Sequence, residues 1–91
     1  MADITVRFQP TPNPNAGKFT VNRAVVEGPA SKSFYSADQA VGEPVAAALF
    51  SIDGVAGLFM VADFITVTKV ANAAWDRLVP EVISVIEQSM A

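Results

Sequence analysis

The stretch Ile-Asp-Gly-Val-Ala-Gly-Leu-Phe-Met-Val-Ala-Asp-Phe-Ile-Thr-Val-Thr-Lys, residues 52–69, decides the fold. It begins with a turn at Asp53-Gly54, where glycine can adopt the positive φ that such a turn requires. Residues 55–61 are apolar at successive positions, which favours a strand covered on both faces and placed centrally in its sheet. Ala62 and Asp63 separate it from residues 64–69, where apolar residues alternate with threonines. A connection this short predicts an antiparallel hairpin, on or beside which the rest of the chain packs.

Two strands are expected before this hairpin. Residues 3–9 alternate, with Val6 and Phe8 pointing inward, and residues 18–21 do the same with Phe19 and Val21. The three prolines in residues 10–14 remove backbone donors and fix φ, so the connection is a stiff loop rather than a helix or a central strand. These strands therefore form a second antiparallel hairpin, and residues 33–35 add a short edge strand.

Two helices complete the pattern. Ser36 is a good N-cap with Gln39 as its capping-box partner, and Pro44 suits the first position of a fresh helix. The last helix is expected to be capped by Asn72 and to continue through Pro80 with a kink. Its apolar residues recur with the period of one helical face, at Trp75, Leu78, Val79, Val82, Ile83 and Ile86.

The order of elements is strand, strand, short strand, helix, strand, strand, helix. It predicts an α+β fold, with an antiparallel β-sheet of three to four strands and two helices packed on one face. A length of 91 residues fits a single domain spanning residues 1–91.

Composition excludes several classes of protein. A chain that is 52% hydrophobic and 16% charged is not intrinsically disordered, and no apolar run is long enough to span a membrane. Six basic residues are scattered in a chain of net charge −3, so a nucleic-acid partner is not expected. No basic region precedes an apolar stretch at the N-terminus, so we expect no secretory signal and a cytoplasmic location.

Cysteine and histidine are both missing from the chain. It therefore contains no disulfide, no thiolate nucleophile and no thiolate ligand for a zinc ion or an iron–sulphur cluster. It also lacks the side chain that most often transfers protons near neutral pH. These absences argue against an enzyme.

Four motifs resemble one known family. A Thr-Pro-Asn-Pro-Asn run at residues 11–15 is followed by Lys18-Phe19, and an Ala-Leu-Phe helix end at residues 48–50 leads into Gly54-Val55. Asp-Phe-Ile-Thr-Val-Thr-Lys occupies residues 63–69, and a Trp followed by Pro-Glu-Val lies at positions 75 and 80–82. In this order and register the chain resembles the N-terminal domain of Nfu/NifU-type iron–sulphur cluster scaffold proteins, in a stand-alone form.

The resemblance implies a role in iron–sulphur cluster assembly or delivery. In two-domain members of that family a Cys-x-x-Cys pair in a following domain holds the cluster, and this chain has no cysteine. The resemblance therefore implies an accessory module that docks a cysteine-bearing scaffold or a client apo-protein. We expect a monomer rather than an oligomer, because an amphipathic helix that covers a sheet needs no second subunit. It implies iron or an iron–sulphur cluster through the family alone, with no cofactor held by this chain.

Candidate partner-binding residues come from the family motifs and their neighbours. A preformed loop with exposed amides could bind at low entropy cost, although the same asparagines could instead satisfy local backbone groups. Lysines beside the loop could form a basic spot, or could be ordinary solvated strand residues. The candidates are Thr11, Pro12, Asn13, Pro14, Asn15, Lys18, Asp63, Phe64 and Lys69.

Two other functions stay open at this stage. The chain could be a weak carrier of iron through oxygen ligands from Asp38, Asp53, Asp63 and Asp76, although first-row transition metals bind imidazole and thiolate more strongly. It could also be a generic structural or regulatory interaction module. The aromatic residues Phe59 and Trp75 fit the periodicity of core positions better than that of exposed anchors.

Overall fold

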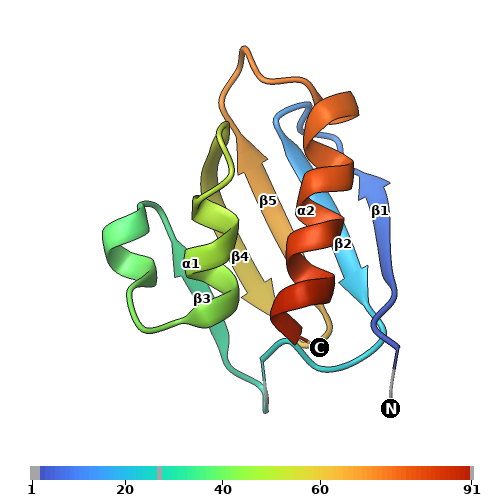
Figure 1. Cartoon of the computed structure of the whole chain (residues 1–91), viewed down its shortest axis with the longest axis vertical. Helices are drawn as coiled ribbons and strands as arrows, with labels where there is room; N and C mark the ends of the chain where they lie inside the picture. Colours follow the sequence, from blue (N-terminus) through green and yellow to red (C-terminus); the bar gives the residue numbers. More distant parts are fainter. Residues whose placement is uncertain (1–2, 27, 91) are drawn as a thin grey trace.

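The fold is a five-stranded antiparallel sheet with its helices on one side (Figure 1). The computed structural model describes residues 3–26 and 28–90. The elements in chain order are β1 (Val6–Pro10), β2 (Ala16–Val21), β3 (Ser31–Phe34), the 3-10 helix η1 (Ala37–Ala40), α1 (Pro44–Phe50), β4 (Val55–Val61), β5 (Phe64–Lys69) and α2 (Trp75–Met90). The expected α+β class and the placement of the helices on one face are confirmed.

The order of strands in the sheet is β1-β2-β5-β4-β3. The two predicted hairpins, β1–β2 and β4–β5, are present, and β2 joins them by pairing with β5. The sheet has five strands rather than three to four, because Ser31–Phe34 pairs with β4 along its length. The middle strand is β5, and β4 lies beside it as an interior strand paired along both edges, as expected.

The core lies between the sheet and the two α-helices. Phe19, Ile65 and Val67 point from the sheet into it and are fully buried. Leu49 of α1 and Leu78, Val82 and Ile86 of α2 are equally buried. The helical periodicity of the sequence therefore identified the face of α2 that covers the sheet.

The prediction that β4 is covered on both faces is wrong. Leu58 and Met60 point into the core, whereas Ala56 is exposed and Phe59 is 40% exposed. No described helix lies on the second face, and a register shift between Val55 and Gly57 breaks the alternation at the start of the strand. The expectation that Phe59 is a core residue is therefore also wrong.

Helix boundaries agree with the sequence at α1 and differ at α2. Pro44 occupies the first turn of α1, and α2 continues through Pro80 as expected. Residues 70–73 form a turn closed by a hydrogen bond from the Ala73 amide to the Val70 carbonyl (3.1 Å), which places Asn72 before the helix. The first helical bond runs from the Leu78 amide to the Ala74 carbonyl (3.1 Å), so Ala74 is the N-cap and the predicted cap at Asn72 is wrong.

The capping box expected at Ser36 is also replaced by another contact. The side chain of Ser36 makes no capping hydrogen bond, and Gln39 Oε1 accepts a bond from the amide of Tyr35 (2.6 Å) instead.

At the end of α1, Gly54 has the positive φ (+104°) expected of the Asp53-Gly54 turn. Within the described ranges, no helix combines the length and apolar character needed to cross a bilayer.

Candidate interaction surface

The loop at residues 11–15 is held by its own side chains. Thr11 Oγ1 donates to the Ala16 carbonyl (2.9 Å) and accepts from the Asn13 amide (3.2 Å). Asn13 Oδ1 accepts from the Asn15 amide (2.9 Å), and the Ala16 amide donates to the Asn13 carbonyl (3.0 Å). These bonds favour the interpretation of the loop as a rigid hairpin connection.

Lys69 fastens this loop to the end of β5. Its side chain is buried, with 8% of the residue exposed, and its Nζ donates to Asn15 Oδ1 (3.1 Å) and to the Val70 carbonyl (3.4 Å). The Trp75 ring lies 5.9 Å from the same Nζ, and its own Nε1 donates to the Pro14 carbonyl (2.9 Å). Lys69 is therefore a buried structural cation on the helical side of the sheet.

The face of the sheet opposite the helices is called here the open face. Its side chains form two rows that cross all five strands, because the strands pair in register. The first row consists of Arg7, Thr20, Phe64, Val61 and Ser31. The second row consists of Gln9, Lys18, Thr66, Phe59 and Ser33.

The centre of the open face is aromatic and bears a cation. Phe59 is 40% exposed, and Phe64 on the neighbouring strand is partly buried. The ammonium group of Lys18 lies 4.4 Å from the centroid of the Phe64 ring, a cation–π contact. The apolar centre is thus exposed and next to positive charge.

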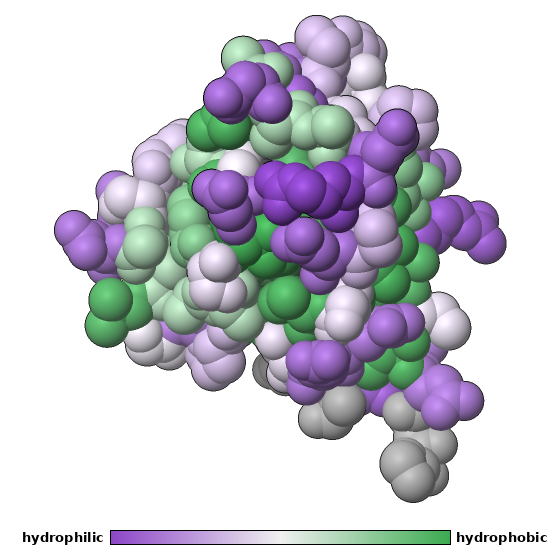
Figure 2. All heavy atoms as spheres, turned by 45° about the horizontal axis from the view of Figure 1, so that its top comes forward, coloured by the Kyte–Doolittle hydropathy of each residue, from purple (hydrophilic) through white to green (hydrophobic). Residues whose placement is uncertain are grey.

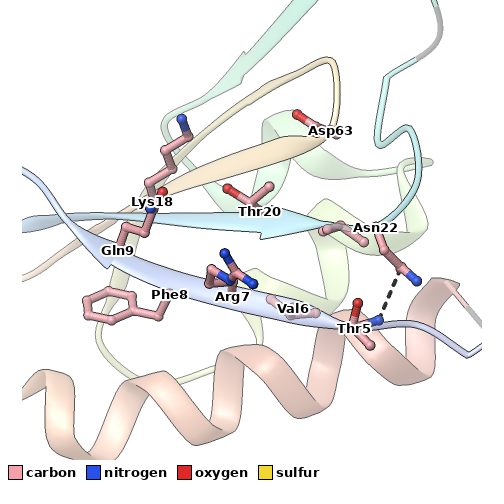
Figure 3. Close-up of a pocket in the computed structure, with 10 residues that line it drawn as sticks. Thr5, Val6, Arg7, Phe8, Gln9, Lys18, Thr20, Asn22 and Asp63 are labelled. Carbon is pink, nitrogen blue, oxygen red and sulfur yellow. Dashed lines mark hydrogen bonds between the residues drawn. The ribbon is translucent and has the colours of Figure 1, made fainter.

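A hollow of about 820 Å³ lies at the β1–β2 end of the open face. Arg7, Lys18 and Thr20 line it together with Asp63 from the β4–β5 turn. Figure 3 shows Phe8 directed toward α2, whereas Lys18, Thr20 and Asp63 project from the other side of the strands. The hydrogen bond from the Thr5 amide to Asn22 Oδ1 (3.1 Å) holds β1 to the segment after β2 at the end of this hollow.

Most acidic residues of the described chain lie on the helical side. Acidic residues gather on the helices and on the turn after α1, at Asp38, Glu43, Asp53, Asp76, Glu81 and Glu87. The ion pairs within residues 3–26 and 28–90, Lys32–Glu43 (2.6 Å) and Arg77–Glu81 (3.2 Å), lie on that helical side. Viewed from the helical side, Figure 2 shows hydrophilic residues in a band across the surface. Arg7 and Lys18 are thus set apart, on the open face.

The structure divides the candidate partner-binding residues into two groups. Lys18, Asp63 and Phe64 meet on or beside the open face. Residues 11–15 and Lys69 belong to a separate cluster against Trp75. Of the two alternatives left open for Lys18 and Lys69, a shared basic spot is ruled out, because the two side chains leave opposite faces of the sheet.

Sequence reasoning placed Arg7 and Thr20 on the outward side of their strands, but it left them and Phe59 out of the candidate partner-binding residues. A signal for the first two was present, because both alternate with inward apolar residues. The hairpin register then places Arg7 opposite Thr20, diagonal to Lys18. Phe59 carried no such signal, since its strand is apolar on both faces.

The residues of this chain do not fit an iron–sulphur cluster. Such clusters are held by cysteine thiolates, with histidine in some cases, and the chain has neither residue. Among the residues that the structure describes, no three acidic side chains come together in a group that could hold a metal ion. The four aspartates considered as oxygen ligands for iron therefore do not form a common site.

Comparison with known proteins identifies the family. The family model described as "Scaffold protein Nfu/NifU N terminal" matches residues 6–91. NFU1 iron-sulfur cluster scaffold homolog, mitochondrial, of Drosophila ananassae is 40% identical over 84 residues, which cover 92% of this chain and 29% of that protein. NifU-like protein 4, mitochondrial, of Arabidopsis thaliana is 38% identical over 81 residues, covering 89% of this chain and 28% of that protein. The chain thus spans less than a third of the length of these relatives.

A solved structure has the same fold. The crystal structure of protein SAV1430 from Staphylococcus aureus superposes with a TM-score of 0.80 at 30% identity and covers 94% of this chain and 100% of that one. The names of the relatives place those proteins in mitochondria, and the cytoplasmic location expected for this chain stays a prediction. The family model spans all of the strands and helices of the fold, and on that basis the chain belongs to the Nfu/NifU N-terminal family.

Proposed function

We propose that this chain is a non-enzymatic recognition module in iron–sulphur cluster assembly or delivery, with residues 1–91 acting as one unit. It binds a cysteine-bearing scaffold or a client apo-protein, and that partner holds the cluster. Family membership supports the link to cluster assembly, since the relatives are named as cluster scaffolds or NifU-like proteins. The lack of cysteine and histidine supports a division of labour in which the metal chemistry resides in the partner.

The observation that carries the proposal is the open face. Globular domains cover most of their large apolar side chains, yet no helix of the described residues covers this side of the sheet, and Phe59 on β4 is 40% exposed there. Aromatic residues with adjacent cations and a polar surround are typical of protein interfaces. The serines of β3 and the threonines and glutamine of the other strands supply that polar surround.

The test is a titration of the isotope-labelled chain with a cysteine-bearing scaffold domain of the Nfu type, followed by backbone amide NMR. The scaffold is added once in its apo form and once loaded with its cluster. We expect saturable shifts at amides of β2, β4 and β5, with a dissociation constant in the micromolar range. A spectrum unchanged by either form at high micromolar concentration contradicts the proposal.

A matched pair of variants identifies the surface. Phe59→Ser removes the exposed aromatic ring from the open face, and Val70→Ser removes an exposed apolar residue beyond the end of β5. Binding should weaken by about tenfold for Phe59→Ser, since aromatic anchors dominate interface energies, and should hardly change for Val70→Ser. Equal effects of the two changes would mean that the partner does not recognise the open face.

A further inference from the structure

We infer that the hollow beside Arg7 and Lys18 is a docking site for an acidic, extended segment of a partner protein. The inference rests on the proposed function and names the chemistry of the partner. Arg7 and Lys18 are the cations of the open face among the described residues, and neither belongs to the ion pairs found there. Carboxylates from another chain would supply the missing counter-charges.

The spacing of the two cations fits an extended chain. Arg7 lies opposite Thr20, and Lys18 lies two residues from Thr20 on the same face, so the cations are diagonal neighbours. Diagonal positions on a sheet are about 7–8 Å apart. Residues i and i+2 of an extended segment point the same way and are about 6.6–6.8 Å apart. Two carboxylates in that arrangement can therefore reach one cation each.

The floor of the hollow and its neighbour supply the remaining contacts. Thr20 stands between the cations and can donate a hydrogen bond from its hydroxyl. Phe64 is the next residue in the same cross-strand row, with the Lys18 ammonium 4.4 Å from its ring centroid. A side chain that follows the two acids along the segment continues the line from Arg7 to Lys18 and lies over β5 near Thr66 and Thr68, where an apolar group can contact the threonine methyl groups.

Asp63 sets the direction in which the acids lie. It lines the hollow beside the end of β2, where its carbonyl accepts a hydrogen bond from the Val21 amide (2.7 Å), and its side chain would repel a carboxylate placed there (Figure 3). The acidic end of the segment is therefore expected over β1 and β2, and its apolar end over β5. The acidic helical side of the molecule disfavours the same ligand elsewhere on its surface.

The probe is a short synthetic peptide in which glutamate, glutamate and leucine occupy alternate positions, with serine between them. The control peptide replaces both glutamates by glutamine. Binding is measured on the whole chain by amide NMR at low salt, where exposed charge pairs are least screened. The acidic peptide should bind with a dissociation constant below about 1 mM and shift amides of β1, β2 and β5, while the glutamine peptide binds at least about fivefold more weakly.

Variants of the chain test the docking site, because some should weaken binding of the acidic peptide and one should strengthen it. Arg7→Gln combined with Lys18→Gln should weaken the acidic peptide at least about fivefold, and Asp63→Asn should strengthen it about twofold. Lys32→Gln is the matched control, since Lys32 is also a strand lysine but lies on the helical side, paired with Glu43. It should change the affinity by less than about 1.5-fold.

Several results would overturn the inference. The acidic peptide could fail to bind, or the two peptides could bind equally well. Lys32→Gln could weaken binding as much as the double variant does. The chain could also dimerise through the open face in a way that the peptide does not inhibit. If a scaffold domain binds elsewhere on the chain, this inference fails and the proposed function survives. If the peptide binds here and no scaffold or client protein does, the inference survives and the proposed function fails.

Discussion

Lys69 differs from the other lysines because its charge is buried. Burying an ammonium group is unfavourable unless hydrogen bonds replace those that it made with water. Asn15 Oδ1, the Val70 carbonyl and the nearby Trp75 ring supply those contacts. The residue therefore links the loop at residues 11–15 to the end of β5 and the start of α2, and serves the fold rather than the surface.

Replacing Asn15 by alanine tests this link. Asn15→Ala removes the side-chain oxygen that accepts a hydrogen bond from the Lys69 ammonium group. Of the two acceptors described, the buried charge then keeps the Val70 carbonyl alone. Hydrogen bonds to charged groups contribute about 1.5–3 kcal/mol, so the free energy of unfolding in urea should fall by about that amount. Asn72→Ala, at an exposed turn, should change it by less than about 0.5 kcal/mol. Equal losses for the two variants would contradict the link.

Ala74 is a poor residue for the position that it occupies. It is exposed, and its carbonyl accepts the first hydrogen bond of α2, but its methyl group satisfies none of the free amides of the first turn. Ala74→Ser should therefore raise the free energy of unfolding by about 0.5–1.5 kcal/mol, as a hydroxyl at the N-cap does. Thermal and urea unfolding measure the gain. Ala71→Ser, outside the helix, serves as the control and should leave stability unchanged, and a similar gain there would rule out capping as the cause.

At the level of elements, an aromatic cluster joins the first hairpin to α2. The ring centroids of Phe8 and Phe19 lie 5.1 Å apart, and those of Phe8 and Trp75 lie 5.5 Å apart. Gly17 lies beneath them, since a Cβ at this position would stand 2.5 Å from Phe8 Cε1 and 3.1 Å from Trp75 Cη2. The glycine is required by close packing and not by an unusual φ.

Gly17→Ala should therefore loosen the contact between β2 and α2. The added methyl group has to displace two ring edges, and overpacking of this kind costs about 1–3 kcal/mol. The expected results are a lower midpoint of urea unfolding and a changed near-ultraviolet circular dichroism signal from Trp75. Ser33→Thr adds a methyl group at an exposed strand position and should have little effect on either measurement. An unchanged Trp75 signal in Gly17→Ala would contradict the packing described.

The strands in which apolar and polar residues alternate were predicted well from the sequence, because this alternation identifies the inward face of a strand directly. Val6, Phe8, Phe19 and Val21 all point as expected. In β4 both faces are apolar, so the pattern could not tell that the Phe59 face lacks a covering helix. Strand order depends on pairing between distant segments, and nothing local to β2 predicted that it pairs with β5.

The candidate site was predicted in part for the same reason. Lys18 and Phe64 lie on strands with a clear alternation, and the structure brings them together. Lys69 is the last residue of β5 and lies on the same face of the strand as the buried residues Ile65 and Val67. Its burial could therefore have been inferred from the alternation. Its contacts with Asn15 and Trp75 could not have been inferred, because these two residues are distant from it in the sequence.

At the level of the whole molecule, the two sides of the sheet have different chemistry. The helical side carries the core, most of the acidic residues and both ion pairs of the described chain. The open face carries two cations, two phenylalanines, Val61 and neutral polar residues, with Asp63 beside it in the β4–β5 turn. An acidic protein with a basic and aromatic face attracts acidic partners locally although its net charge is −3.

The acidic side raises the question of whether the molecule itself takes up iron, and an anaerobic titration with ferrous iron followed by amide NMR answers it. Acidic side chains attract divalent cations weakly, but the described residues form no group of three that could hold one. Imidazole and thiolate, which first-row metals prefer over carboxylate, are missing from the chain. We therefore expect broadening that grows gradually with iron concentration near the exposed acids of the helical side, without saturation at one equivalent.

Two features of this titration separate a carrier from a recognition module. The Asp63→Asn variant should give the same gradual broadening, since Asp63 lies in the β4–β5 turn, apart from the acidic residues of the helical side, and belongs to no metal-binding group among the described residues. Magnesium serves as the diamagnetic control and should compete with iron at the exposed acids, because carboxylates bind both ions without a site of fixed geometry. Broadening confined to Asp63 and residues 11–15, saturating near one equivalent and abolished in Asp63→Asn, would instead mean that the domain carries iron through oxygen ligands. Such a result would overturn the proposal that the partner alone holds the metal.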